Sequence, residues 1–386
     1  MQARKDFNIT ESVDRLISMA ESGMSNSLKG YIRRFLAHLR KRLPIYFILM
    51  IIVFGVLFVF RDDIYDTFIR RHEEKTFYFD EHGLPMTDYG WTQGVYVGPQ
   101  FNPLVIARGA QVYYDQMLDG NTTAAGFLNY TLNWLVENRV TQTIDNESGL
   151  VTVSHWLYNF SIYDQPAGWY SAMAEAEIAH TLAQAYDYSG NPIYLQILNE
   201  TLNGFEVSQE IGGSMLIIDE VGNWYPEVIV PSTVDPTYPK RRILNGFLLG
   251  LEDLYLANEY LNQTRIKRLF DNGINSALQT LHLYEAPENW TFYQLNPVKY
   301  ASVGYHHVHI SITGILYNIT GITEFQTYHE RWKSWTVVPP QADVDLTERR
   351  LKEISYGLLF MSIAAGMILL IDFMQMQVRT RVTSNS

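Results

Sequence analysis

The chain has 386 residues, no cysteine, 47% hydrophobic and 14% aromatic residues, and a formal net charge of −12 at neutral pH. This length and apolar content are typical of one sizeable folded domain and exclude a largely disordered chain. The lack of cysteine excludes disulfides, thiol nucleophiles and cysteine-bound zinc.

The charge is unevenly distributed along the chain. Residues 1–42 hold nine of the 29 Lys and Arg residues and four of the 41 acidic residues, and Arg379 and Arg381 lie near the C-terminus. The segment between them is left with 18 basic and 37 acidic residues. Because nucleic-acid binding needs a basic surface, we expect no nucleic-acid partner.

The N-terminal segment, residues 1–42, is predicted to be a basic cytosolic arm. Its last part, residues 29–42, reads KGYIRRFLAHLRKR. This pattern is typical of a basic amphipathic helix that lies on anionic lipid, and the alternative is a plain basic flank for the segment that follows.

Residues 43–61 and 353–372 are predicted to be transmembrane helices. Each contains an uncharged apolar run close to the ~17–20 residues needed to cross a bilayer; the alternative is a buried core helix. Basic residues before the first run and after the second place both termini, including the tail 373–386, in the cytosol. The expected protein is therefore a two-pass integral membrane protein with a lipid bilayer as partner.

Eight glycosylation sequons of the form Asn-x-Ser/Thr lie between the two predicted spans. An acceptor of this kind is used only where the chain faces outward, so together they favour a middle domain on the cell surface or in the secretory lumen. The acceptor residues are Asn121, Asn129, Asn146, Asn159, Asn199, Asn262, Asn289 and Asn318.

The middle region, residues 75–340, is predicted to be one mainly α domain with short β-hairpins. Helical periodicity indicates helices over 104–117, 123–138, 168–188, 193–206, 243–261, 264–284, 308–319 and 324–335. Strands or hairpins are expected over 77–98, 150–160 and 213–230. Consecutive helix pairs predict an α/α toroid, that is, an incomplete α/α barrel. We expect its ligand cleft between the loops 164–170, 222–242 and 290–309.

The stretch with the most chemistry is residues 290–309, WTFYQLNPVKYASVGYHHVH. It combines tyrosines with three histidines where an ordinary core would have Leu, Ile and Val. A metal site on the histidines is the less favoured interpretation. In the Ala-rich helix upstream, Glu175 and Glu177 are predicted to lie on a solvated face, with a position in the cleft as the alternative.

Six segments resemble, in order, the C-terminal domain of the D-glucuronyl C5-epimerases of heparan sulfate and heparosan synthesis. They are GWYSAMA at 168–174, NWYPE at 223–227, LNGF at 244–247, FYQL at 292–295, YHHVHI at 305–310 and RWKS at 331–334. The resemblance covers roughly residues 102–334. It implies an α/α barrel, a uronic-acid-containing glycan as substrate, and no cofactor or metal.

The resemblance also implies roles for particular residues. Tyr305 and Glu227 would transfer the C5 proton, and Tyr293 would support one of them. The chemistry agrees, because the C5 hydrogen is α to a carboxylate, and its inversion needs a base, an acid and neutralisation of charge. The expected substrate-binding residues are Trp169, Tyr170, Tyr225, Arg241, Arg242, Asn245, His306 and His309. For the two arginines, a solvated helix start is the alternative.

Two other functions remain open at this stage. A uronate polysaccharide lyase begins with the same proton abstraction but expels the substituent at C4. A non-catalytic glycan-binding membrane protein would explain why Val228 and Asn296 depart from the family pattern. A glycoside hydrolase is disfavoured because Glu227 has no evident carboxylate partner. A homodimer is left open.

Overall fold

The computed structural model describes residues 76–339 except 93–94, 147–148 and 219–220, together with the single residues Gly30 and Ile354. The first of these ranges lies in the compact unit Ile69–Thr347. The predicted arm 1–42, the spans 43–61 and 353–372, and the tail 373–386 fall outside the described residues apart from those two positions. Within the described part, no helix combines the length and the apolar character needed to cross a membrane.

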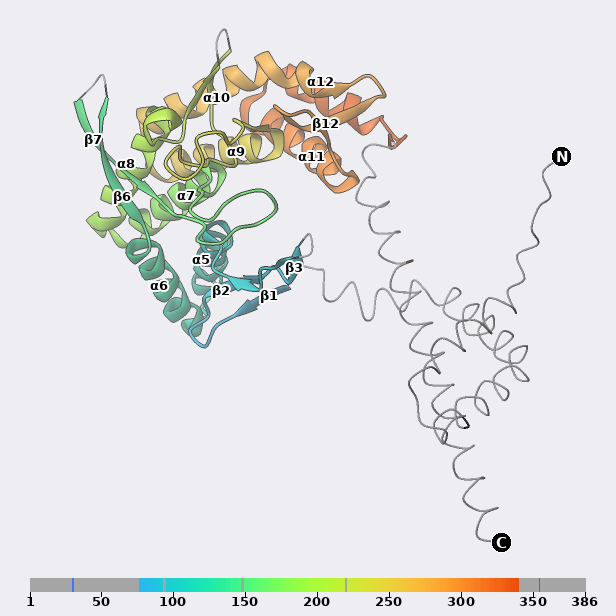
Figure 1. Cartoon of the computed structure of the whole chain (residues 1–386). Helices are drawn as coiled ribbons and strands as arrows, with labels where there is room; N and C mark the ends of the chain where they lie inside the picture. The colour runs from blue at the N-terminus through green and yellow to red at the C-terminus, as the bar shows by residue number, and fades with distance from the viewer. Residues whose placement is uncertain are drawn as a thin grey trace, which may run out of the picture. The chain divides into compact units, whose positions relative to one another are not determined.

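The described residues form a mainly helical domain, as predicted (Figure 1). Its eight α-helices come in four pairs, and only two or three residues join the helices of a pair, so they run antiparallel. The pairs are α5 (Pro103–Leu118) with α6 (Thr122–Glu137), α7 (Ala172–Ser189) with α8 (Pro192–Glu206), α9 (Leu244–Leu261) with α10 (Thr264–Thr280), and α11 (Val303–Thr320) with α12 (Thr323–Lys333).

The tight turns within the pairs depend on left-handed residues that end the first helix. Gly190, Asn262 and Gly321 have φ angles of 65°, 49° and 69°, and each donates its backbone N–H back to the last turn of its helix. Glycine adopts this conformation without a Cβ clash, and asparagine tolerates it better than most residues. The chain therefore reverses directly after α7, α9 and α11.

The first helices of the four pairs contact one another in chain order, α5 with α7, α7 with α9 and α9 with α11, and the pairs follow an arc (Figure 1). The most extensive of these contacts is between α7 and α9, where small residues face each other. A Cβ added to Gly250 would lie 3.6 Å from the Cβ of Ala176. As a result α7 has almost no exposed face along its first four turns, and all residues from Ala174 to Ala185 are buried.

This burial corrects one prediction. Glu175 and Glu177 do not lie on a solvated face, since they are 1% and 3% exposed. The carboxylate of Glu175 accepts one hydrogen bond from the Ser214 hydroxyl and lies 2.6 Å from Nδ1 of His155, and that of Glu177 pairs with Arg108 at 2.8 Å. Buried carboxylates of this kind need such partners.

Short strands occupy the connections that precede α5 and separate the helix pairs. A three-stranded antiparallel sheet has the order β1 (Thr76–Phe79), β2 (Pro85–Asp88), β5 (Pro99–Gln100). Hairpins pair β3 (Trp91–Thr92) with β4 (Val95–Tyr96), β6 (Val140–Asn146) with β7 (Gly149–His155), and β8 (Leu216–Ile218) with β9 (Gly222–Trp224). The last sheet has the order β10 (Arg242–Ile243), β12 (Trp290–Leu295), β11 (Glu285–Ala286), with β13 (Lys299–Tyr300) also on β12.

Because the turns within pairs lie at one end of the helices, these longer connections all lie at the other end, where α7, α9 and α11 begin.

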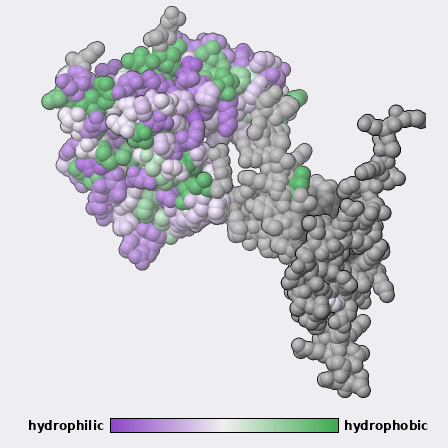
Figure 2. Space-filling view, viewed as in Figure 1, coloured by the Kyte–Doolittle hydropathy of each residue, from purple (hydrophilic) through white to green (hydrophobic). Residues whose placement is uncertain are grey.

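The surface of the domain combines hydrophilic and hydrophobic residues. Figure 2 shows hydrophilic residues interspersed with smaller hydrophobic groups on the face in view. Most large apolar side chains are instead buried in one core between the helices.

Two helix starts differ from the prediction. Helix α11 begins at Val303, five residues before the predicted start at 308, because Ser302 caps it by accepting from the N–H of Tyr305. Helix α7 begins at Ala172 and not at 168, because Gly168 has a φ of 94° and Ser171 provides the cap. The strand β6 was not predicted, since its residues are mostly polar and exposed.

Helix α5 begins at a cap with more partners than usual. The side-chain oxygen of Asn102 accepts from the N–H groups of Leu104 and Val105 and from the hydroxyl of Tyr158, and its amide donates to the hydroxyl of Tyr89. We expect Asn102→Ala to lower the free energy of unfolding by about 2 kcal/mol, the upper end for a lost cap. The reason is that it also removes a partner from two buried hydroxyls. Urea unfolding measures this loss.

Asn121→Ala is the matched control for that cap. Asn121 caps α6 with the same two backbone bonds but is exposed and has no tyrosine partner in the described part of the chain. Its loss is expected to cost about 1 kcal/mol. If both variants lose the same stability, the tyrosine contacts of Asn102 contribute nothing.

Candidate active site

Three side chains from distant segments meet at the loop end of the helix pairs. Strand β12 carries Tyr293 and the first turn of α11 carries Tyr305, and the two rings lie 4.5 Å apart between centroids. The third is Glu227, whose carboxylate acts electrostatically on the Tyr293 hydroxyl. Tyr305 is 42% exposed, and Tyr293 and Glu227 are half-buried. A molecule from solvent can therefore reach this group, which we call the tyrosine site.

The backbone around Glu227 is fixed against the start of α7. The N–H of Ala172 donates to the carbonyl of Pro226 at 3.0 Å, and that of Ile229 to the carbonyl of Tyr170 at 2.9 Å. The carboxylate itself accepts from Nδ2 of Asn245 at 3.1 Å. Loops that are far apart in sequence thus hold one carboxylate in place.

The protonation of Tyr293 follows from its surroundings. Burial raises the pKa of its hydroxyl far above the usual value, and the neighbouring Glu227 carboxylate and Tyr305 raise the pKa further. Tyr293 therefore keeps its proton at neutral pH, so its hydroxyl is able to donate a hydrogen bond.

Three cationic side chains lie near the tyrosine site, and they differ in whether an acidic residue pairs with them. The guanidinium of Arg241 makes two hydrogen bonds to the carboxylate of Asp164 and lies 4.9 Å from the ring centroid of Tyr238. Arg242 lies on β10, half-buried. The ammonium of Lys299 is 5.9 Å from the ring centroid of Tyr293 and has no ion pair with any residue that the structure describes. Lys299 is thus the more available cation beside the tyrosine site.

Three predicted substrate-binding residues lie in the core. The hydroxyl of Tyr225 donates to the carbonyl of Leu269, and that of Tyr170 donates to the carbonyl of Gly213. Trp169 stacks on Tyr158 with 3.8 Å between ring centroids. Their exposed fractions are 2%, 2% and 8%. In this structure they support the loops and do not face solvent.

His306 and His309 are also buried, and together with Thr291 they form a hydrogen-bond chain of defined direction. Nε2 of His306 faces the carbonyl of Trp332, so it carries the proton, and its Nδ1 accepts from the Thr291 hydroxyl at 2.9 Å. That hydroxyl in turn accepts from Nδ1 of His309 at 3.0 Å. The chain fixes β12 on α11, and in this way it holds Tyr293 beside Tyr305.

The same burial predicts an acid-sensitive fold. It lowers the pKa of His306 from 6.5 to about 4 and that of His309 from 6.5 to about 3. The unfolded chain takes up these protons near pH 6.5, but the folded chain does not. The free energy of unfolding is therefore expected to fall as the pH drops from about 6.5 towards 4. Urea midpoints measured across this range check the slope.

His309→Gln is the comparison for this slope. The variant is expected to be less stable at neutral pH, because the hydrogen bond to Thr291 is weakened, but to lose less stability on acidification. If the free energy of unfolding falls equally with pH in the variant and the wild type, His309 does not cause the acid sensitivity.

Sequence reasoning missed three contributors to the site. Thr291 gave no signal, because its role depends on the contact between β12 and α11. Lys299 begins the two-residue strand β13, which has no recognisable sequence pattern. Gly246 was noticed only as part of a motif, yet a Cβ there would come within 2.3 Å of a carboxylate oxygen of Glu227. Asn245, which was predicted, does contact this carboxylate.

The sequence of this domain is similar to that of carbohydrate epimerases. Residues 150–334 match the family model described as D-glucuronyl C5-epimerase C-terminus. Glu227, Tyr293 and Tyr305 all lie within it.

Individual relatives differ in how much of their length is matched. The chain is 27% identical over 271 residues to the protein MJ1128 of Methanocaldococcus jannaschii, which covers 67% of this chain and 85% of that protein. It is 28% identical over 186 residues to the D-glucuronyl C5-epimerase of Caenorhabditis elegans, which covers 43% of this chain and only 29% of that enzyme. A sugar epimerase from a ruminal bacterium is a structural neighbour with a TM-score of 0.48 and 12% identity, covering 67% of this chain and 66% of the other.

Proposed function

We propose that this chain is a uronic acid C5-epimerase that acts on D-glucuronyl residues of a glycan, with the helix pairs forming part of an α/α toroid. The main support is the meeting of Glu227, Tyr293 and Tyr305 at the loop end. Inversion at a carbon α to a carboxylate needs one group that removes a proton and a second that returns one to the opposite face. Glu227 and Tyr305 are two such groups.

In the proposed reaction, the carboxylate of Glu227 takes the C5 proton. The electron pair of the broken C–H bond moves into the sugar carboxylate, which makes C5 planar. The hydroxyl of Tyr305 then gives its proton to the opposite face of C5. Since Tyr305 is exposed, its phenolate recovers a proton from water, and Glu227 releases its proton to water. The protonated Tyr293 stabilises the phenolate by a hydrogen bond, and in the reverse direction Glu227 and Tyr305 exchange roles.

Charge develops on the sugar carboxylate during this step and has to be stabilised. Lys299 is the first candidate for this contact, because no described acidic residue pairs with it. Arg241 is the second, and it would have to share its guanidinium with Asp164.

The test is solvent exchange at C5. The purified full-length protein is incubated in deuterated water with a panel of glucuronate and mannuronate polysaccharides, and NMR detects deuterium at C5. We expect deuterium in both epimers of one substrate, and loss of this signal with Glu227→Gln. Glu324→Gln, which changes an exposed glutamate on α12, is the matched control and should keep the signal.

Other outcomes have defined meanings. An unsaturated product that absorbs in the ultraviolet would show that the protein is a uronate lyase and not an epimerase. No exchange with any polysaccharide of the panel, together with retained binding, would leave a non-catalytic glycan-binding protein.

We also propose that residues 43–61 and 353–372 anchor the domain to a membrane, with the domain outside the cytosol. The support is the apolar sequence of both segments and the position of the sequons. Among the acceptor residues, Asn146 and Asn199 are half-buried and the other six are exposed. Washing of membranes with alkaline carbonate tests this proposal: the full chain should stay in the pellet, and a form lacking both segments should be released. Release of the full chain would overturn the anchor.

A further inference from the structure

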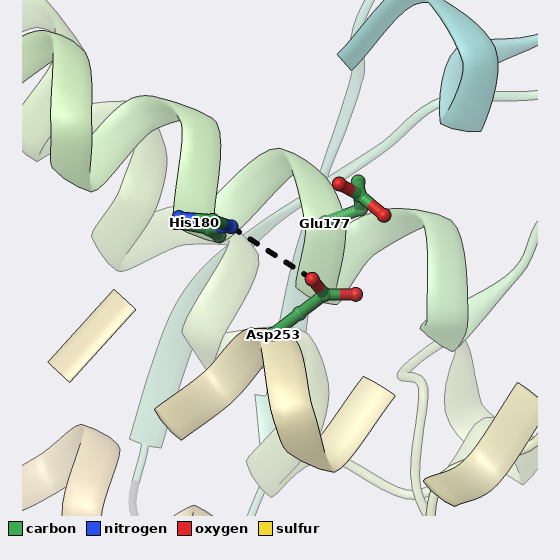
Figure 3. A group of neighbouring side chains, drawn as sticks. All are labelled: Glu177, His180 and Asp253. Atoms are coloured by element: carbon green, nitrogen blue, oxygen red, sulfur yellow. Dashed lines mark ion pairs between the residues drawn. The ribbon is translucent and has the colours of Figure 1, made fainter. Parts of the chain in front are cut away.

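A second group of polar side chains lies between helices α7 and α9, apart from the tyrosine site. Glu177 and His180 are three residues apart and therefore share one face of α7, and Asp253 projects towards them from α9 (Figure 3). One ligand-type atom from each of the three lies within 4.8 Å of the others. All three side chains are buried.

The charges of this group are not balanced by the described residues around it. Arg108 pairs with Glu177 at 2.8 Å, but its side chain is half-exposed. The contact of Asp253 with His180 is 3.8 Å long, and Glu252 on the same helix adds a further negative charge nearby. A buried carboxylate is costly unless a cation or several donors compensate it. Burial raises the pKa of both carboxyl groups, and a bound cation would compensate their charge when they are ionised.

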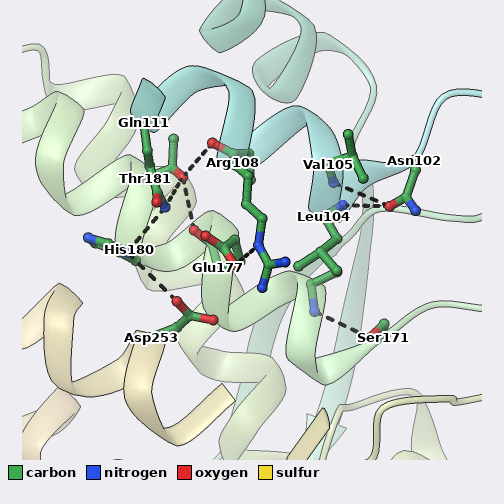
Figure 4. A network of polar contacts seen from close by, with 12 residues as sticks. Asn102, Leu104, Val105, Arg108, Gln111, Ser171, Glu177, His180, Thr181 and Asp253 are labelled. Atoms are coloured by element: carbon green, nitrogen blue, oxygen red, sulfur yellow. Dashed lines mark hydrogen bonds and ion pairs between the residues drawn. The ribbon is translucent and has the colours of Figure 1, made fainter. Parts of the chain in front are cut away.

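The direction of the hydrogen bonds shows which ring nitrogen of His180 is unprotonated. The amide of Gln111 donates to Nδ1 of His180 at 3.1 Å, so this nitrogen carries no proton and its electron pair accepts that bond (Figure 4). The same amide also lies 3.0 Å from the hydroxyl oxygen of Thr181. If a cation took Nδ1, Gln111 would keep that second partner. Nδ1 and the nearest oxygen of Asp253 are thus two electron-pair donors that face each other across 3.8 Å.

We propose that Glu177, His180 and Asp253 bind one divalent transition-metal cation, with Zn²⁺ as the best match. One imidazole nitrogen with two carboxylates is a ligand set that suits Zn²⁺, whereas Ca²⁺ prefers oxygen ligands alone. Bonds of about 2.0–2.2 Å to nitrogen and oxygen require ligand atoms about 3–4 Å apart. The separation between His180 and Asp253 already meets this requirement, and a small rotation of Glu177 completes the set.

The cation would be structural and not part of the proton transfer. It would join α7 to α9, the two helices whose first turns lie on either side of the Glu227 loop. Because it binds the folded state, it is expected to raise the melting temperature.

The test uses the full-length protein after removal of metals with a chelator and dialysis. Zn²⁺ is titrated against a chromophoric competitor, and the melting temperature is followed by differential scanning fluorimetry. We expect one tight Zn²⁺ per chain, a higher melting temperature, and no comparable effect of Ca²⁺. Asp253→Asn and His180→Gln are each expected to weaken binding by more than about tenfold.

The controls are His282→Gln and Asp271→Asn. His282 is exposed and Asp271 is half-buried, and both lie outside the group, so these variants should leave binding unchanged. Circular dichroism without metal shows whether each variant is folded, and His180→Gln alone decides the matter if Asp253→Asn is not. Binding that is equally tight in the wild type and in His180→Gln would place the ion on the surface and overturn the proposal, as would the absence of tight binding.

Discussion

Tyr305→Phe is expected to lower the rate of C5 exchange by about 10²–10⁴-fold, the range for loss of a positioned acid or base. The substitution removes only the hydroxyl, and the remaining ring can still pack 4.5 Å from that of Tyr293. Because the side chain is 42% exposed, the free energy of unfolding should change by less than about 0.5 kcal/mol. The effect should therefore appear in kcat with little change in KM.

Tyr300→Phe is the control for this experiment. Tyr300 lies on β13, and its hydroxyl hydrogen-bonds to Glu288 and not to the tyrosine site. It should keep the rate of the wild type. A Tyr305→Phe protein with an undiminished rate would remove Tyr305 from the proton transfer, while leaving open whether Glu227 acts.

The helices could be predicted because their signals lie within the local sequence. The apolar period in 264–284 and the Gly or Asn residue after each first helix of three pairs are visible in the sequence, and α10 and the turns follow from them. The start of α11 could not be predicted in the same way. Its first turn holds Tyr305 and His306, which serve the site and break the apolar pattern.

The interior polar groups show where sequence reasoning fails. The pattern around Glu175 and Glu177 is that of an exposed face, and only the contact of α7 with neighbours on several sides makes both residues buried. Their partners, such as His155 and Arg108, are 20 and 69 residues away. A pairing across such a separation leaves no periodic signal. The motif segments around Glu227 and Tyr305 predicted two segments that the structure brings together, but the contacts of Thr291 and Gly246 needed the structure.

Gly246→Ala is expected to lower the C5 exchange rate by about 10²-fold, the cost of moving a catalytic group by about 1 Å. A Cβ at this position would lie 2.3 to 2.6 Å from Oε2, Cβ and Cγ of Glu227. Since real contacts of this type are not so short, the carboxylate has to leave its position beside Asn245. The backbone at Gly246 is helical, so strain in φ does not explain a loss.

Gly126→Ala separates this displacement from a general effect of alanine in a helix. Gly126 lies in α6, and no atom lies within 4 Å of the Cβ that alanine would add. This variant should gain about 0.5–1 kcal/mol of stability from helix propensity, with unchanged exchange. If Gly246→Ala also keeps its exchange rate, the observed position of Glu227 is not required for the reaction. If it loses the rate but remains as stable as the wild type, the space left by one missing methyl group is part of the catalytic site.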